Sequence, residues 1–244
     1  MHEQITVMVL AGGYGTRLSS IVADRPKVLA DVNGRPFLSY LLDQISILKV
    51  KSIIICSGYK GELIVQAFQY NYKGNVLVYS QEPNPLGTAG ALKLSLNFCS
   101  SEHIMVMNGD SFCDTNLLSF VEWHCLKSAD STILLTQVVN SERFGFVKTD
   151  EDGKIEEFEE KGVGRNGWIN AGVYLIRREI IATIPSNRTV SLEREVFPFL
   201  IGKKFYGYKS HGAFIDIGTP ESYKKAEEFF TKRLEKNHLE KAML

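Results

Sequence analysis

The sequence predicts an α/β fold, in which helices flank a mixed, mostly parallel sheet that carries a small antiparallel addition. Two observations lead to this prediction. In the first half of the chain, short apolar runs rich in β-branched residues alternate with segments of helical periodicity, as in a doubly wound parallel sheet. In the second half, strand-like segments follow one another, which indicates antiparallel pairing.

The elements of the first half are predicted from residue spacing. Three consecutive isoleucines at 53–55, ended by Ser57-Gly58, are typical of a buried strand. Apolar residues at 37, 38, 41, 42, 45 and 48 follow the period of a helix. By the same criteria we expect strands at 5–10, 53–55, 76–79, 104–107 and 131–138, and helices at 37–48, 63–68, 88–98 and 115–127.

The second half adds strand-like segments at 144–149, 155–158 and 168–176, with a tight turn at Asp152-Gly153. These segments are expected at an edge of the sheet. Residues 189–194 are expected to form a loop. Pro220 should open a helix whose apolar face includes residues 223, 226, 229, 230 and 234, and the tail after Asn237 should fray.

Composition places the chain among ordinary globular proteins. Its 244 residues include 28 basic and 28 acidic side chains, and 44% are hydrophobic. The apolar content argues against disorder, and the lack of a basic excess argues against nucleic-acid binding. No apolar run suits a membrane span, and no signal peptide is visible. We expect one domain over 1–244, with one half at about 1–140 and another at about 141–235.

Four cysteines, at 56, 99, 113 and 125, form no C-x-x-C pair. They are interpreted as reduced thiols, which favours a cytoplasmic protein. Oligomeric state is left open, and a homo-oligomer is compatible with the sequence.

The most informative segment is a glycine-rich loop directly after the first strand. Glycine at 12, 13 and 15 lets the backbone approach a ligand closely and expose N–H groups that can bind phosphate oxygens. Arg17 and Lys27 can neutralise a phosphate chain. The residues expected to contact the phosphate-bearing ligand here are Leu10, Ala11, Gly12, Gly13, Gly15 and Thr16.

Two common phosphate-binding motifs are excluded. A Walker A loop requires Gly-Lys-Ser/Thr, which the chain lacks. A dinucleotide fingerprint beginning at Gly13 would need glycine at position 18, where Leu18 stands. An NAD-dependent oxidoreductase is therefore disfavoured.

The loop and several later motifs resemble the sugar-1-phosphate nucleotidyltransferases over nearly the whole chain. The matching motifs, in order, are Leu10–Leu18, Arg25–Lys27, Glu82-Pro83, Leu86–Gly90, Asn108–Asp110, Phe144-Gly145, Glu159–Lys161, Asn170–Gly172 and Asp216–Pro220. The resemblance implies a Rossmann-like sheet and one reaction, in which a nucleoside triphosphate and a sugar 1-phosphate give an NDP-sugar and pyrophosphate. It also implies that the half at about 1–140 binds the nucleotide and the half at about 141–235 binds the sugar. The substrates would be small molecules, with no nucleic acid or membrane partner.

The reaction joins two anions, so charge neutralisation and positioning should dominate catalysis. Mg²⁺ suits this task because it binds carboxylates and phosphate oxygens together. Asp110 follows a strand end, where open α/β sheets bind ligands. The resemblance implies that Asp110 and Asp216 hold the metal.

The resemblance assigns further roles. Arg17 would hold the β- and γ-phosphates, Lys27 would contact phosphates near the reacting centre, and Lys161 would bind the sugar phosphate. Gly87 and Thr88 would join the nucleotide site. The sugar would be contacted by Gly145, Glu160, Asn170 and Glu193.

Glu82 falls where the family reads the base. A carboxylate can accept both the N1–H and the amino group of guanine, so Glu82 favours GTP. Within the family, the chain is most similar to guanylyltransferases for D-glycero-α-D-manno-heptose 1-phosphate. Mannose-1-phosphate guanylyltransferases and small uridylyltransferases for N-acetylmuramate 1-phosphate are the alternatives. A non-catalytic sugar-nucleotide sensor is a further alternative, disfavoured because Arg17, Lys27 and both aspartates are present.

Overall fold

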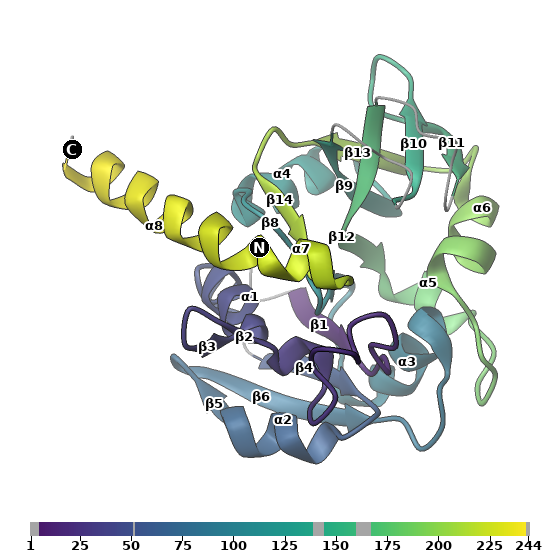
Figure 1. Ribbon diagram of the computed structural model, residues 1–244. Coiled ribbons are helices and arrows are strands. Elements are labelled where there is room, and N and C mark those ends of the chain that lie inside the picture. Colours follow the sequence, from purple (N-terminus) through teal and green to yellow (C-terminus); the bar gives the residue numbers. More distant parts are fainter. Residues whose placement is uncertain (1–4, 51, 139–143, 160–166, 243–244) are drawn as a thin grey trace.

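A computed structural model describes residues 5–50, 52–138, 144–159 and 167–242 (Figure 1). Its centre is a ten-stranded sheet. The main path of hydrogen-bonded neighbours runs β11-β10-β12-β7-β1-β4-β6-β5, and β9 pairs with both β12 and β13. These strands are β1 (Ile5–Ala11), β4 (Ser52–Ser57), β5 (Asn71–Tyr72), β6 (Asn75–Gln81), β7 (His103–Asn108), β9 (Ser131–Val138), β10 (Phe146–Thr149), β11 (Ile155–Glu159), β12 (Gly167–Arg177) and β13 (Phe205–Lys209).

Helices cover both faces of the sheet (Figure 1). The helices are α1 (Phe37–Ser46), α2 (Gly61–Phe68), α3 (Gly87–Ser95), α4 (Leu117–Leu126), α5 (Arg178–Ala182), α6 (Phe197–Leu200), α7 (Pro220–Lys224) and α8 (Ala226–Ala242). Short 3₁₀ turns occupy Lys27–Leu29 and Leu96–Phe98, and a π-helix spans Leu192–Val196. Two small antiparallel sheets join β2 (Asp31–Val32) to β3 (Arg35–Pro36), and β8 (Ser111–Cys113) to β14 (Phe214–Asp216).

The two-residue period of the buried strands separates two hydrophobic cores. In β1, Val7 and Val9 face the core that contains α1, α2, α4 and the start of α8. Met8 faces the opposite core, with α3, α5 and α6. Because successive strand side chains point to opposite faces, a continuous apolar run is what a sheet covered on both sides requires. This is the α/β fold that the sequence predicts.

The neighbouring strands β6, β4, β1 and β7 are parallel, and β13 is parallel to β9. The antiparallel strands β10 and β11 lie at an edge, as expected. The third predicted strand differs, because β12 lies inside the sheet and pairs antiparallel with β7, β9 and β10. Its central residues 171–176 are buried, so it joins the core of the sheet rather than extending its rim.

Three local expectations need correction. The helix predicted from Pro220 is divided into α7 and α8, and Leu234 is 48% exposed. The helix continues to Ala242, beyond Asn237, where we expected the regular structure to end. Helix-forming Glu and Lys residues and the Glu228–Lys232 ion pair, one turn apart, favour this continuation. The loop expected at 189–194 is in part the π-helix.

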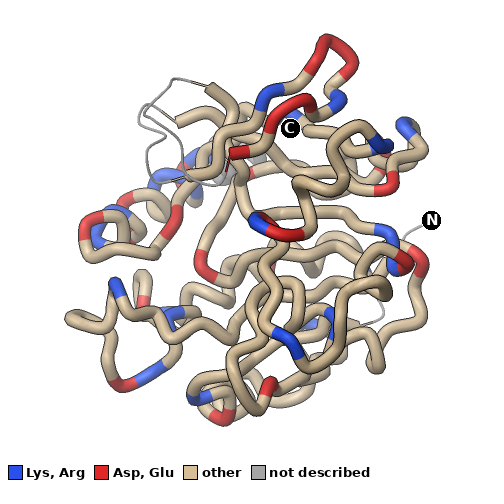
Figure 2. Tube along the Cα trace, turned by 90° about the vertical axis from the view of Figure 1, so that its right-hand side faces the viewer, with Lys and Arg blue, Asp and Glu red and all other residues tan. Residues whose placement is uncertain are grey.

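Charged residues of both signs are interspersed along the trace (Figure 2). This mixture agrees with the formal net charge of zero. Within the described ranges, no helix has the length and hydropathy required to cross a bilayer.

Candidate active site

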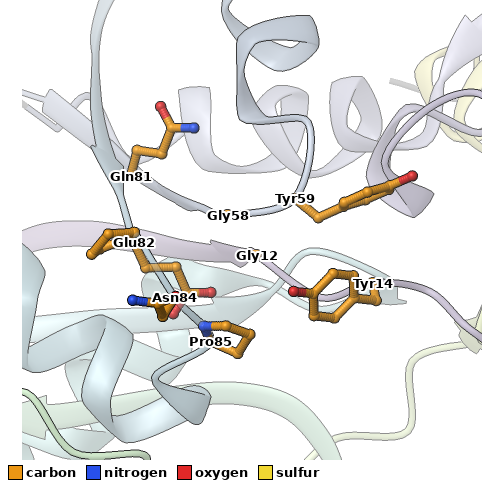
Figure 3. Close-up of a pocket in the computed structure, with 9 residues that line it drawn as sticks. Gly12, Tyr14, Gly58, Tyr59, Gln81, Glu82, Asn84 and Pro85 are labelled. Atoms are coloured by element: carbon orange, nitrogen blue, oxygen red, sulfur yellow. The ribbon is translucent and has the colours of Figure 1, made fainter.

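Two adjoining cavities lie where the parallel strands end. One has a volume of about 290 Å³ and reaches from the glycine-rich loop to Asn108 and Asp110. The other, of about 410 Å³, extends past Gly58 and Tyr59 (Figure 3). They share the lining residues Gly12, Tyr14, Glu82 and Pro85. Ligands of open α/β sheets bind at this edge.

The smaller cavity brings together most of the residues that the sequence assigns to the nucleotide. Residues from five separate parts of the chain meet here: the end of β1 and its loop, the turn at Lys27, the end of β4, the β6–α3 connection, and the end of β7. The predicted residues that line it are Leu10, Ala11, Gly12, Gly13, Lys27, Glu82, Gly87, Thr88 and Asp110.

Glu82 lies between two glycine segments. Its Oε2 accepts a hydrogen bond of 2.8 Å from the backbone N–H of Leu86. A Cβ at Gly58 would lie 2.8 Å from Oε1, and one at Gly12 would overlap the same oxygen. Burial raises the pKa of Glu82, and the Leu86 bond opposes this shift. Glycine at 12 and 58 is therefore what makes room for the carboxylate.

Lys27 and Asp110 form an ion pair at the other end of this cavity. Their side chains are only 14% and 29% exposed. Gly15 has a φ of +62°, and a Cβ there would lie 3.2 Å from the Lys27 Cβ. A side chain at residue 15 would therefore strain the backbone and crowd Lys27, and glycine avoids both.

Asp110 and Asp216 come from backbone segments that are hydrogen-bonded to each other. The N–H of Ile217 donates to the carbonyl of Asp110 over 2.9 Å, and Asp216 pairs with Ser111 between β14 and β8. The Asp216 Oδ1 also accepts from the N–H of Gly218 over 3.0 Å. The two predicted metal ligands thus belong to one short antiparallel pairing, although Asp216 lines a different cavity, of about 390 Å³.

These donors fit a magnesium ion that is completed by substrate oxygens. Mg²⁺ in such sites takes one or two carboxylates, with waters and phosphate oxygens filling the other positions. The nearby Asn108 Oδ1 is buried and has no hydrogen-bond partner in the described part of the chain, so it is an unused oxygen beside Asp110. No group of three or more His, Cys, Asp or Glu side chains that could hold a metal occurs within the described ranges. A site made by protein ligands alone is therefore not indicated there.

Arg17, Thr16 and Gly15 are not among the residues that line the two cavities. Arg17 is exposed. Its guanidinium makes no hydrogen bond or ion pair with the described residues. The Thr16 carbonyl accepts a 2.7 Å bond from Ser19 and closes the turn that follows the loop.

The predicted sugar residues Gly145 and Asn170 lie together outside the two cavities described above. The Gly145 carbonyl accepts a 2.9 Å bond from the Asn170 N–H. The Asn170 side chain donates to the Tyr174 hydroxyl over 2.9 Å and accepts from the Gly172 N–H over 2.8 Å. Asn170 is therefore held by its own strand. Glu160 and Lys161 lie outside the described residues.

Glu193 contacts Thr88, a residue that lines the smaller cavity. The Thr88 hydroxyl donates to Glu193 Oε2 over 2.9 Å and accepts from the Leu192 N–H over 2.8 Å. Ser191 donates to the same carboxylate oxygen. The start of the π-helix is thus fastened to the start of α3, and the structure brings together a residue predicted for the sugar and one predicted for the nucleotide.

Several lining residues are absent from the sequence-based set: Tyr14, Val28, Cys56, Gly58, Tyr59, Gln81, Pro83, Asn84, Pro85, Ala91 and Asn108. Gly58 and Tyr59 follow β4 directly, as the glycine-rich loop follows β1. Adjacent parallel strands end at the same edge, and this rule could have identified both residues from the sequence.

Comparisons with known proteins agree with this geometry. A family model described as nucleotidyl transferase matches residues 6–233. The chain is 36% identical over 221 residues to D-glycero-alpha-D-manno-heptose 1-phosphate guanylyltransferase of Aneurinibacillus thermoaerophilus, covering 90% of this chain and 96% of that one. It is 35% identical to mannose-1-phosphate guanylyltransferase of Mycobacterium tuberculosis, covering 91% of this chain and 63% of that one.

Solved structures show the same similarity. The crystal structure of HddC from Yersinia pseudotuberculosis superposes with a TM-score of 0.81 at 33% identity, covering 92% of this chain and 99% of that one. The same protein complexed with GMP-PN gives a TM-score of 0.80 with the same coverage.

Proposed function

Because the chain belongs to the nucleotidyl transferase family, and is an enzyme of that family, we propose that it transfers a guanylyl group from GTP to D-glycero-α-D-manno-heptose 1-phosphate. The products are GDP-heptose and pyrophosphate. The observation that carries this proposal is the cavity in which the glycine-rich loop, Lys27, Asp110 and Glu82 meet. It combines groups that suit a triphosphate, a metal ion and a base.

The base preference rests on Glu82. One of its oxygens already accepts the Leu86 N–H, but each carboxylate oxygen has two lone pairs. The carboxylate can still accept the N1–H and amino hydrogens of guanine. A uracil edge places carbonyl oxygens beside its single N–H, and these would be repelled by the carboxylate. The named guanylyltransferases among the relatives support the same preference.

The reaction requires a sugar-phosphate oxygen to attack the α-phosphorus of GTP. The new P–O bond forms as the bond to the β-phosphate bridging oxygen breaks, and pyrophosphate leaves with that electron pair. Arg17 and Lys27 bind the phosphates and offset the repulsion between the two anions. Asp110 and Asp216 would hold Mg²⁺, which supplies further charge neutralisation when bound. The loop N–H groups position the triphosphate.

The sugar site belongs to the half at about 141–235. Lys161 would bind the sugar phosphate, and Gly145, Glu160, Asn170 and Glu193 would surround the sugar. Heptose is favoured because two heptose 1-phosphate guanylyltransferases, at 36% and 34% identity, are each matched over 96% of their length. Mannose 1-phosphate is the second candidate, because the Mycobacterium tuberculosis enzyme is 35% identical.

A cytoplasmic location goes with this proposal. The cysteines are free thiols, and Cys56, Cys99 and Cys113 are buried, as expected of a chain that folds without disulfides in a reducing compartment.

A matrix of nucleotides and sugars tests the proposal. Pyrophosphate release is measured for GTP, ATP, UTP, CTP and dTTP with heptose, mannose, glucose and N-acetylmuramate 1-phosphates in the presence of Mg²⁺. We expect the highest kcat/KM for GTP with the heptose phosphate. A preference for a pyrimidine nucleotide would refute the base assignment, and a preference for mannose 1-phosphate would refute the sugar assignment. No pyrophosphate release with any pair would refute the reaction.

A further inference from the structure

The cavity beside Glu82 has a second wall that the phosphate and base assignments do not use. Tyr14 and Tyr59 lie there with ring centroids 5.3 Å apart and ring planes at 43°. Tyr14 is 56% exposed and Tyr59 is 37% exposed. We call these two residues the aromatic wall. Two neighbouring aromatic rings that remain this exposed at a cavity have π-surface available to a ligand.

We propose that the aromatic wall stacks against the nucleotide base and makes the site selective for a purine. The inference rests on the proposed function, because it takes the base to be the group that Glu82 reads. It adds Tyr14 and Tyr59 as base-recognition residues.

The position of the wall supports this role. Both rings line the same cavity of about 410 Å³ as Glu82. Figure 3 shows Glu82, Asn84 and Pro85 on one side of this cavity and the two tyrosines on the other, with Gly12 and Gly58 between them. A guanine that gives its N1–H and amino hydrogens to Glu82 has its second ring on the side away from the carboxylate. That side of the cavity is where the aromatic wall lies.

One side of the wall is anchored. Lys60 donates to the carbonyls of Ala23 and Asp24 over 3.1 and 2.9 Å, and its ammonium lies 5.1 Å from the centre of the Tyr59 ring. Tyr59 is therefore held beside the segment that follows the glycine-rich loop. Tyr14 belongs to the glycine-rich loop itself. The contact between the two rings therefore joins this loop, which we assign to the phosphates, to the segment after β4.

The size of the base gives the selectivity. Stacking on aromatic side chains requires only a π-face and grows with the overlapping area. A two-ringed purine can contact both Glu82 and the wall, whereas a single pyrimidine ring offers less area for the same span. The wall therefore adds shape selection to the hydrogen-bond selection by Glu82.

The test separates base binding from loop positioning. Binding of MgGTP and of magnesium tripolyphosphate, which has no base, is measured by calorimetry without sugar phosphate. In Tyr14→Ala and Tyr59→Ala we expect GTP to bind about tenfold more weakly, the order of one lost stacking contact, while tripolyphosphate affinity is unchanged. Tyr14→Phe and Tyr59→Phe should retain GTP affinity, because they keep the ring. Tyr14→Leu keeps apolar bulk without a π-face and should resemble the alanine variant.

Tyr70→Ala is the matched control. Tyr70 is 68% exposed and pairs with Tyr79 at 5.9 Å, but lines neither cavity. Equal losses for both ligands would show that the rings only hold the loop, and no loss would show that they do not touch the base. Either result overturns the proposal.

If the wild-type protein prefers a pyrimidine nucleotide, the guanylyl proposal and the purine selectivity both fail. Whether the aromatic wall stacks on a base is then still tested, because the affinities of the tyrosine variants for that pyrimidine nucleotide and for tripolyphosphate can be compared.

Discussion

The ammonium of Lys27 lies against the carboxylate of Asp110, although 83 residues separate them in the sequence. The pair joins the turn after Pro26 to the end of β7. It places a cation beside a carboxylate that we assign to a metal, at one end of the nucleotide cavity. The charges that would meet a triphosphate and its metal are thus adjacent in the folded protein.

Asp110→Asn should lower kcat/KM by at least about 100-fold, or about 2.7 kcal/mol of transition-state stabilisation, because it removes a charge that we propose binds the metal. Steady-state pyrophosphate release with varied Mg²⁺ measures this. Asp43→Asn is a suitable control, since Asp43 pairs with Arg35 and Lys73 and lines neither cavity. Near-normal turnover of Asp110→Asn would contradict the assigned role.

Arg17→Ala should lower kcat/KM by at least about 100-fold, because the exposed guanidinium is assigned to the departing pyrophosphate. Inhibition by added pyrophosphate should weaken in parallel. The control is Arg188→Ala, an exposed arginine outside both nucleotide cavities. If pyrophosphate inhibits the Arg17 variant as well as it inhibits the wild type, the guanidinium does not bind that product.

The central strands and most helices could be predicted because their signals are local. The consecutive isoleucines of β4 reflect a strand that is buried on both faces. The helical spacing of apolar residues in α1 reflects a helix that is buried on one face. The place of β12 could not be predicted in this way. Strand pairing depends on partners such as β7, which ends about 60 residues earlier. The local sequence of β12 does not show which strands it pairs with.

The same distinction applies to the site. The glycine-rich loop and Asp110 could be assigned because each follows a strand, and the structure places both in one cavity. The bond between Thr88 and Glu193 spans 105 residues and has no sequence signature. Tyr59 was missed because a Gly-Tyr pair after a strand is not a motif, although its position at the shared edge made it a candidate.

Glu82→Gln should lower kcat/KM for GTP by about 10- to 100-fold, the range expected for leaving a buried donor unpaired. The glutamine oxygen can still accept the Leu86 N–H, but its amide N–H groups would face the N–H groups of guanine. For ITP, which lacks the 2-amino group, the same substitution should lower kcat/KM by a smaller factor. Equal losses for GTP and ITP would show that Glu82 does not read the amino group.

His124 should make stability depend on pH. Burial lowers its pKa to about 3, and its ring nitrogens contact Thr132 and His103 at 2.7 and 3.0 Å. The unfolded chain binds a proton below about pH 6.5, whereas the folded chain does not until about pH 3. The free energy of unfolding should therefore not depend on this group above pH 6.5. As the pH is lowered from about 6.5 to about 3, it should fall by about 1.4 kcal/mol per pH unit.

Urea unfolding of the wild type and His124→Gln between pH 4 and 7 checks this prediction. The variant need not match the wild type in stability, since only the slope is compared. The slope of the wild type should be steeper, because other titrating groups are common to both proteins. Parallel slopes would show that His124 does not carry the effect.

The most direct test of the central assignment is a crystal structure with Mg²⁺ and a non-hydrolysable GTP analogue. We expect the phosphates against the loop at residues 10–17, the base at Glu82, and the metal about 2.1 Å from oxygens of Asp110 and Asp216. A nucleotide bound elsewhere, or a metal that contacts neither aspartate, would contradict the assignment.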